Sequence, residues 1–208
     1  MSIAKNEELL GKMDLKKQYT YDDILALPEG KRAEIIDGHW YDLASPRMGH
    51  QRIAGAIYRK LSDYVESNQG SCEAFIAPSA VFLEDINNSY VEPDVFVVCD
   101  PDKVQDDGCH GAPDLVVEVA SPSSERKDMA VKLFKYRACG VREYWIVNPM
   151  KQVVTVYAFS EDEEAEEAGQ YSFKDAVPSR LYPDFVMDFS RFVERYESIE
   201  LKNANHSN

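Results

Sequence analysis

Cysteine is scarce in this sequence, and no two cysteines have the CxxC spacing of a zinc or redox site. The four that are present are Cys72, Cys99, Cys109 and Cys139. We therefore expect reduced, mostly buried thiols in a cytosolic protein. Cys109-His110 would form a soft pair of metal ligands, but it lacks partners at the spacing that a zinc site needs.

Long apolar runs are also absent. No run approaches the roughly 18 to 20 residues that span a bilayer. The N-terminus lacks a basic region followed by an apolar core, so we expect a cytoplasmic protein with no secretory signal and no membrane partner. The 208 residues, 44% of them hydrophobic, predict one domain with its own core. We place that domain at residues 19–196, between an N-terminal arm (1–18) and a polar tail (197–208).

Positive charge is in short supply. Lys and Arg number 23 against 37 Asp and Glu, which gives a net charge of -14. This balance excludes a protein coated in basic surface for nonspecific DNA binding, but it allows a local basic groove. Part of the excess lies in the acidic run of residues 161–167, which we interpret as a solvated loop.

Apolar periodicity and turn residues predict an ordered series of helices and strands. We expect helices at 19–28, 50–67, 125–139 and 185–196, strands at 73–83, 90–99, 114–120 and 141–147, hairpins at 33–43 and 153–173, and a polar loop at 100–113. Asp37-Gly38 marks the turn of the first hairpin. Ser124 is expected to cap the helix 125–139 and Gly140 to end it. The core face of that helix is expected to carry Met129, Ala130, Leu133, Phe134 and Tyr136.

The order of these elements defines the fold class. Strand 114–120, the helix after it and strand 141–147 form a crossover unit, which implies a right-handed parallel pair. The two strands before this unit are joined by a short turn, so they pair antiparallel. We therefore expect an α/β (α+β) fold. It has a mixed sheet in α-β-β-β-α-β order, flanked by helices, and an extra N-terminal hairpin.

One acid lies in the most apolar strand. Residues 115–120 are almost wholly Val, Leu and Ala, as in a strand buried on both faces, and Glu118 lies among them. A carboxylate there costs several kcal/mol unless a cation or strong donors meet it. We expect a metal ion or a lysine beside Glu118. Otherwise Glu118 lies at the solvated end of the strand or pairs with a structural arginine.

Two aspartates that follow a proline could join Glu118. Asp114 is four residues away on the same strand, about 13 Å, which is too far for one Mg²⁺ with ligand distances of about 2.0–2.1 Å. Asp94 lies on another strand, and neighbouring strands are only about 4.8 Å apart. Asp94 with Glu118 is therefore the feasible pair of hard oxygen ligands for Mg²⁺ or Mn²⁺. Taken alone, Asp94 has the more common interpretation of a turn or strand-edge aspartate.

The order of elements, with Pro93-Asp94 and Glu118, resembles the core of the PD-(D/E)xK nucleases. A closer resemblance is to the Uma2-type restriction endonuclease family, formerly known as a domain of unknown function. It runs from about Tyr19 to Phe159. It is carried by Glu34-Ile-Ile-Asp-Gly, Ser45-Pro, His50-Gln, Glu92-Pro-Asp94, Asp114-Leu-Val-Val-Glu-Val, Ser121-Pro-Ser-Ser, Asp128, Lys132, Tyr136, Gly140-Val and Glu143-Tyr-Trp-Ile-Val. The resemblance implies a restriction-endonuclease-like core and metal-dependent nuclease chemistry.

The resemblance also implies a displaced lysine. The wider superfamily has a lysine two residues after the acid, where this chain has Ala120. Such a cation holds and polarises the attacking water and offsets charge at the phosphorus. The Uma2-like pattern moves the lysine to the next helix, where Lys132 matches and Lys135 is a second candidate. Without that role, Lys132 would form a surface pair with Asp128 worth a few tenths of a kcal/mol.

Two further residues are candidates for the site. Glu34 begins the first hairpin, and the resemblance makes it an acid that orients water or a second ion; its residue type alone favours a solvated hairpin glutamate. His50 opens the helix 50–67, where it could touch a phosphate or act as a helper base. A structural hydrogen bond at the helix start is an equal alternative for His50.

These residues predict a metal-dependent endonuclease that acts on nucleic acid, with DNA as the expected substrate. Asp94 and Glu118 would hold the ion, and Lys132 would assist the water and the transition state. A homodimer would suit the cutting of both strands. The alternative is a nuclease fold that serves as an inactive binding or interaction module, which the acidic balance and Ala120 favour. A third possibility is a buried structural ion pair between Glu118 and Lys132, with no ligand.

Overall fold

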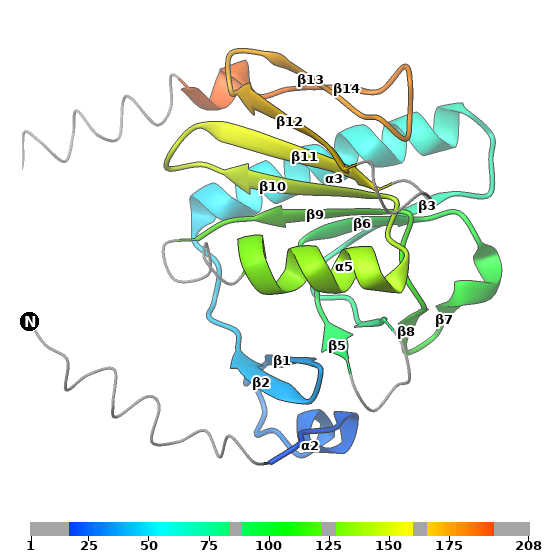
Figure 1. Cartoon of the computed structure of the whole chain (residues 1–208), viewed down its shortest axis with the longest axis vertical. Helices are drawn as coiled ribbons and strands as arrows, with labels where there is room; N and C mark the ends of the chain where they lie inside the picture. The colour runs from blue at the N-terminus through cyan, green and yellow to red at the C-terminus, as the bar shows by residue number, and fades with distance from the viewer. Residues whose placement is uncertain (1–16, 84–88, 122–127, 160–165, 194–208) are drawn as a thin grey trace, which may run out of the picture.

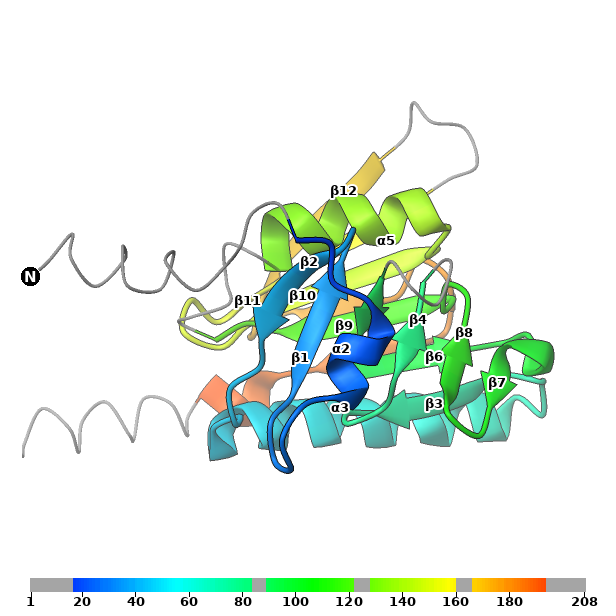
Figure 2. The ribbon, with the colours of Figure 1, turned by 90° about the horizontal axis from the view of Figure 1, so that it is seen from below.

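A six-stranded mixed sheet lies between two helices in the computed structural model of the chain (Figure 1). The structure describes residues 17–83, 89–121, 128–159 and 166–193. The strands of this main sheet run in the order β12, β11, β10, β9, β6 and β3, and α3 and α5 cover opposite faces (Figure 2). The bounds are α3 Met48–Ser67, β3 Glu73–Ile76, β6 Val95–Val98, β9 Leu115–Val119, α5 Leu133–Cys139, β10 Glu143–Asn148, β11 Val153–Phe159 and β12 Glu166–Ser172.

The expected α-β-β-β-α-β order is confirmed in the main sheet. It runs α3, β3, β6, β9, α5 and β10 along the chain. β9 and β10 are parallel neighbours joined through α5, and β11 and β12 add the expected second hairpin. β6 pairs antiparallel with both β3 and β9. Because β6 and β9 run in opposite directions, the start of β6 lies beside the end of β9.

A second sheet contains strands that the sequence predicted as parts of longer ones. Its order is β2, β1, β5, β4, β8 and β7. The bounds are β1 Ala33–Ile36, β2 His39–Asp42, β4 Val81–Phe82, β5 Tyr90–Val91, β7 Val104–Gln105 and β8 Gly108–His110, with a 3₁₀ turn, η1, at Pro101–Lys103. The expected single strands 73–83 and 90–99 were wrong, because each divides between the two sheets. Pro78 and Pro93 lie at the divisions, where proline cannot donate to a ladder. The expected loop 100–113 was wrong too, since it contains β7 and β8.

The N-terminal hairpin, β1 with β2, is confirmed. Asp37 and Gly38 have φ angles of 50° and 74°, the left-handed values that an Asp-Gly hairpin turn requires. The short helix before it, α2, spans Tyr21–Leu25, and the Asp23 carboxylate accepts a hydrogen bond from the Thr20 backbone N–H. β1 also pairs with β5, so the hairpin is an integral part of the second sheet.

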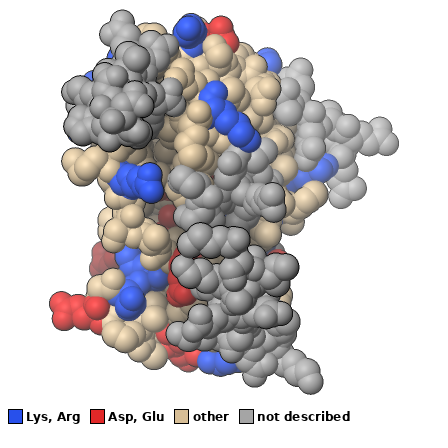
Figure 3. Space-filling view, turned by 90° about the vertical axis from the view of Figure 1, so that its left-hand side faces the viewer, with Lys and Arg blue, Asp and Glu red and all other residues tan. Residues whose placement is uncertain are grey.

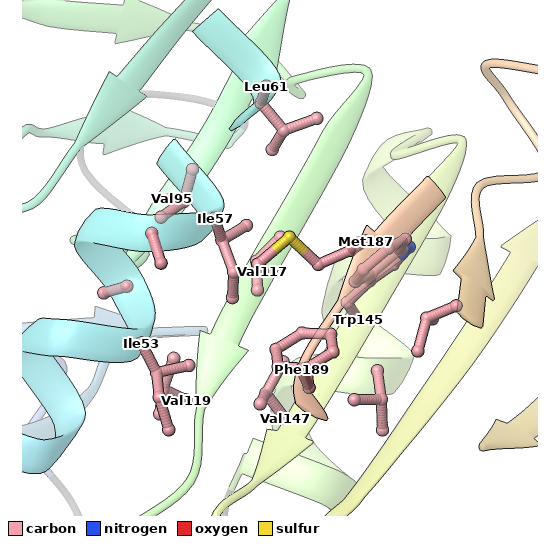
Figure 4. Packing of buried hydrophobic residues seen from close by; sticks show 14 of the residues in the cluster. Ile53, Ile57, Leu61, Val95, Val117, Val119, Trp145, Val147, Met187 and Phe189 are labelled. Carbon is pink, nitrogen blue, oxygen red and sulfur yellow. The ribbon is translucent and has the colours of Figure 1, made fainter. Parts of the chain in front are cut away.

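The larger core lies between α3 and the main sheet. Ile53, Ile57 and Leu61 follow the expected helical spacing and pack against the sheet near Val95 and Val117 (Figure 4). This burial fixes α3 along the sheet. Within the described ranges, no helix combines the length and apolar character needed to cross a bilayer.

Two short strands complete the same core at the C-terminal side. β13, Ala176–Pro178, pairs antiparallel with β14, Val186–Asp188. Met187 and Phe189 lie against Trp145 and Val147 (Figure 4). The expected helix at 185–196 was wrong over its first residues, which form β14. A helical turn begins only at Ser190.

In the part of the chain that the structure describes after residue 127, the first helical turn is a wide π-helical turn. This turn, η2, spans Asp128–Lys132, and α5 continues to Cys139 and ends at Gly140, whose φ is 90° as expected. The predicted core face was wrong at Ala130, which is exposed, and at Phe134, which is 68% exposed. The π turn adds a residue per turn, so it shifts the face that a regular α-helix would bury. The buried face carries Lys132, Lys135 and Tyr136.

The cysteines are not all reduced. Cys72 and Cys99 form a disulfide, while Cys109 is a buried thiol and Cys139 is half-buried. The register of β3 and β6, with Glu73 opposite Val98, brings Cys72 and Cys99 together when it continues by one residue. Such a pairing depends on strand register and cannot be read from cysteine spacing. The expectation of four free thiols was wrong for this pair.

Some expectations fall outside the described residues. These are the cap at Ser124, most of the N-terminal arm, the polar tail and the acidic run up to residue 165. Glu166 and Glu167, the last two residues of that run, belong to β12 and therefore extend the second hairpin.

Candidate active site

A buried lysine lies between two buried glutamates where the two sheets meet. Lys132 Nζ donates to Glu118 Oε1 at 2.6 Å and to Glu34 Oε1 at 2.8 Å. None of the three residues is more than 5% exposed. In such a low-dielectric place each of these charge-assisted bonds is stronger than it would be in water. One ammonium group therefore faces two carboxylates that water does not screen.

Each member of this triad comes from a different element. Glu118 lies in β9, and its neighbours Val117 and Val119 pack on the α3 side. Side chains alternate along a strand, so Glu118 points to the α5 side. Lys132 ends the π turn on that side, and Glu34 arrives from β1 of the second sheet. The site therefore requires both sheets and the helix to be in place.

Tyr136 adds a second donor to Glu118. Its hydroxyl donates to Glu118 Oε1 at 2.8 Å, one helical turn beyond Lys132. Burial, and then the Glu118 charge, raise the pKa of Tyr136 well above its usual value of 10.0. The hydroxyl therefore keeps its proton and remains a donor. The sequence carried a signal for this contact, because Lys132 and Tyr136 are four residues apart on one helix face.

Asp94 lies across the strand pair from Glu118. Val95 is opposite Val117, and the same register continued by one residue pairs Asp94 with Glu118. Asp94 Oδ2 accepts a hydrogen bond from the Val119 backbone N–H at 2.7 Å. It also lies 3.1 Å from His50 Nε2, in the first turn of α3. The structure therefore brings Asp94, Glu118, Lys132, Glu34 and His50 to one region.

Glu92 supports this region from the second sheet. Its backbone N–H donates to Glu34 Oε1 at 3.1 Å. Its carboxylate accepts from Tyr90 at 2.8 Å and forms an ion pair with Arg32. Sequence reasoning did not assign these three residues to the site. The available signal was Glu92 directly before Pro93-Asp94.

Two interpretations from residue type were wrong. Glu34 is not a solvated hairpin glutamate, because it is 0% exposed, and Lys132 is not in a surface pair, because it is 3% exposed. The side chain of Asp128 lies outside the described residues. Lys135, the second candidate lysine, donates instead to Asp37 Oδ1 at 2.6 Å. The Asp37 side chain is 63% exposed, so this pair lies at the surface end of the same helix face.

The chemistry of the Asp94 and Glu118 carboxylates suits a hard divalent cation, which prefers oxygen ligands. Asp94 and Glu118 offer oxygens from neighbouring strands. Mg²⁺ is usually held by one or two carboxylates and takes its other ligands from water and substrate phosphates. Among the residues that the structure describes, no group of three or more His, Cys, Asp or Glu has the geometry of a metal cage. An ion bound here would therefore rely on solvent or substrate for the rest of its coordination.

Comparison with protein families identifies the chain's relatives. Residues 20–190 match the Uma2 family model, described as "Putative restriction endonuclease". This chain belongs to the Uma2 family. The matched range includes Glu34, His50, Asp94, Glu118 and Lys132. Family membership confirms the resemblance and supports a nuclease function.

Individual proteins and solved structures are also similar to this chain. The uncharacterized protein slr1290 of Synechocystis sp. is 28% identical over 134 residues, which cover 64% of this chain and 68% of that protein. A crystal structure from Anabaena variabilis, described as a "putative nuclease belonging to DUF820", matches with a TM-score of 0.65 at 19% identity. That match covers 83% of this chain and 96% of the Anabaena chain. It shows that the Uma2 chain shares the fold of that protein.

Proposed function

We propose that this Uma2 protein is a metal-dependent endonuclease that hydrolyses phosphodiester bonds in DNA. The observation that carries the proposal is the hydrogen bond from the buried Lys132 to Glu118. Glu118 lies near the end of β9, and Asp94 is opposite it on the neighbouring chain segment. A cation beside paired carboxylates is the arrangement that phosphodiester hydrolysis requires. Lys132 occupies the role that the superfamily gives to a lysine on the strand itself, where this chain has Ala120.

Asp94 and Glu118 would hold Mg²⁺ or Mn²⁺, which when bound polarises the scissile phosphate and lowers the pKa of a bound water. Lys132 positions the attacking water and offsets the charge that develops at the phosphorus. Glu34 and Tyr136 fix the orientation of Lys132 and Glu118 through the hydrogen bonds described above. His50 holds Asp94 and lies near enough to contact a substrate phosphate.

A cleavage assay tests the assignment. The purified protein is incubated with supercoiled plasmid and with single-stranded DNA, in Mg²⁺, Mn²⁺ or EDTA. We expect metal-dependent cleavage that Asp94→Asn, Glu118→Gln and Lys132→Ala each abolish. Asp114→Asn is the matched control, because Asp114 is at the other end of the same strand region and pairs with Arg142. Cleavage that survives Glu118→Gln or Lys132→Ala would show that the site is elsewhere.

A homodimer is part of the same proposal, because two sites would cut both strands. Light scattering on the purified protein gives its mass, and the plasmid assay separates nicked from linear product. A dimer that yields linear product directly supports paired cutting. If the protein is a monomer that only nicks the plasmid, the dimer is excluded, but the proposed active site still stands.

The second candidate is a binding module that keeps the fold without catalysis. It is favoured by Ala120 and by the bond through which Lys132 neutralises the charge of Glu118. Calorimetric titration with Mn²⁺ separates the two. Binding that Glu118→Gln removes supports the nuclease, whereas a wild-type protein with no Mn²⁺ affinity and no cleavage supports the inert module.

A further inference from the structure

From Arg47, just before α3, to Lys60 within it, the chain presents a cationic surface on an acidic protein. Although the chain has a net charge of -14, it has no acidic residue between Asp42 and Asp63. That stretch contains four Lys or Arg residues, all exposed, which we call the α3 cation surface: Arg47, Arg52, Arg59 and Lys60. The opposite face of the helix is buried against the sheet. The charge is therefore presented outward along a fixed helix.

These four cations differ from the others around the site. Arg32 pairs with Glu92, Lys135 with Asp37, and Arg142 with Asp114. Within the part of the chain that the structure describes, the side chains of the α3 cation surface form no ion pair with an acid. Their charge remains available to an anion from outside the protein.

The α3 cation surface begins beside the candidate active site. His50, in the first turn of α3, lies 3.1 Å from Asp94. At a rise of about 1.5 Å per residue, Arg47 and Arg52 are within about 5 Å of His50 along the helix axis, and Arg59 is about 14 Å away. Acids return only in the last turns, at Asp63 and Glu66. The positive end of the helix is thus the end next to the site.

The space-filling view shows the side of the molecule on which α3 begins (Figure 3). Lys and Arg are spread over the upper part of this face with little acid between them, and most of the Asp and Glu lie in its lower part. An extended polyanion would therefore meet an uneven field here, attractive over one region and repulsive over the other. DNA has this form, with one phosphate per roughly 3.4 Å of each strand.

We propose that the α3 cation surface binds the phosphate backbone of the DNA substrate and leads it to Asp94 and Glu118. This inference rests on the proposed nuclease function and adds the surface that recognises the substrate. Backbone contacts of this kind position DNA without reading its sequence. They also explain how a protein with a strongly negative net charge can hold a polyanion at one place.

The test measures binding of a labelled DNA duplex by fluorescence anisotropy in EDTA, where a metal-dependent nuclease cannot cut. The variants are Arg47→Gln with Arg52→Gln, and Arg59→Gln with Lys60→Gln. The matched control, Lys31→Gln with Lys174→Gln, removes two exposed lysines elsewhere and gives the same change in net charge. All six side chains are exposed, so circular dichroism should show unchanged folding.

Removing one cation that neutralises a phosphate should weaken DNA binding roughly tenfold at about 0.1 M salt and reduce the slope of log K against log salt by about 0.9. We expect each α3 pair to weaken binding 10- to 100-fold by this rule, with the larger effect at Arg47 and Arg52. The control pair should change affinity by less than about twofold. An equal decrease in affinity in all three variants would show an effect of net charge alone and would overturn the inference.

Two other outcomes separate this inference from the proposed function. If the wild-type protein cuts DNA and the α3 variants bind DNA as tightly as wild type, the role of the α3 cation surface is refuted, but the proposed nuclease function still stands. Protein that neither binds nor cuts DNA would refute both. Sedimentation with phosphatidylserine vesicles tests the competing anion, and binding to vesicles in place of DNA would also overturn the inference.

Discussion

Replacing Lys132 by methionine should destabilise the fold strongly, because it leaves two buried carboxylates without their shared cation. Lys132 donates to Glu118 and Glu34, and both acids are nearly inaccessible to water. A hydrogen bond to a charged group contributes about 1.5–3 kcal/mol. Removing one partner of a buried ion pair costs about 3–5 kcal/mol. We therefore expect Lys132→Met to lower the free energy of unfolding by about 3–5 kcal/mol.

Lys135→Met is the matched control. Lys135 is also buried and lies on the same helix face, so both changes remove one buried lysine from similar surroundings. Its partner Asp37 is 63% exposed at the side chain, so water can solvate that carboxylate once the lysine is gone. Pairs of this kind contribute about 0–1 kcal/mol. The difference between the variants therefore isolates the cost of stranding Glu118 and Glu34.

Urea unfolding followed by circular dichroism measures the difference. With a slope of about 3 kcal/mol per molar urea, Lys132→Met should unfold at roughly 1–2 M less urea than wild type, and Lys135→Met within about 0.3 M of it. Equal midpoints for the two variants would refute the reasoning, since the burial of the partner acids would then not matter. A change in slope would instead indicate a change in the unfolded or folded state.

Three further predictions concern single residues. Tyr136→Phe removes the hydroxyl bond to Glu118 and should cost about 1.5–3 kcal/mol in urea unfolding; an unchanged midpoint would mean that the bond contributes nothing. Gly140→Ala should lower stability by about 1–2 kcal/mol, measured thermally, because φ is 90° there and only the backbone conformation, with no neighbour within 4 Å, opposes a Cβ. Burial raises the pKa of the Cys109 thiol to about 11 from 9.0. The folded protein therefore holds a proton that the unfolded chain loses between pH 9 and 11, and stability should fall as pH rises across that window. Cys109→Ala should flatten this part of the pH profile, and an equal slope in that variant would contradict the assignment.

Strand geometry was enough to predict which residues are neighbours in part of the candidate site. Strand spacing favoured Asp94 over Asp114 as the partner of Glu118, and the register of β6 and β9 has Asp94 opposite Glu118. The apolar run around Glu118 also predicted correctly that a cation would meet it. The position of Asp94 followed from strand spacing, and the cation beside Glu118 followed from the cost of burying an unpaired charge. That the two acids share an ion stays a prediction.

The remaining contacts depend on long-range packing. Glu34 was interpreted from residue type as solvated, because nothing near it in sequence reveals that Lys132 and the backbone of Glu92 meet it. The division of strands at Pro78 and Pro93 was missed for a similar reason. Both halves of each predicted strand are apolar. The apolar pattern alone does not reveal that β4 and β5 pair within a second sheet while β3 and β6 remain in the main sheet. The displaced Lys132 came from family resemblance alone, since residue type would have placed it in a surface pair with Asp128.

The triad also allows a separation of stability from function. Replacing a buried ion pair or triad by apolar residues of similar size is often neutral or stabilising by about 1–4 kcal/mol. The combined change Glu34→Met, Glu118→Leu and Lys132→Met should therefore recover the stability that Lys132→Met alone removes. If so, folding does not require these charges, and their burial must serve another purpose. The same protein should have no metal-dependent cleavage under the proposed function. A triple variant much less stable than Lys132→Met would assign the charges to folding, and a triple variant that still cuts DNA would remove them from catalysis.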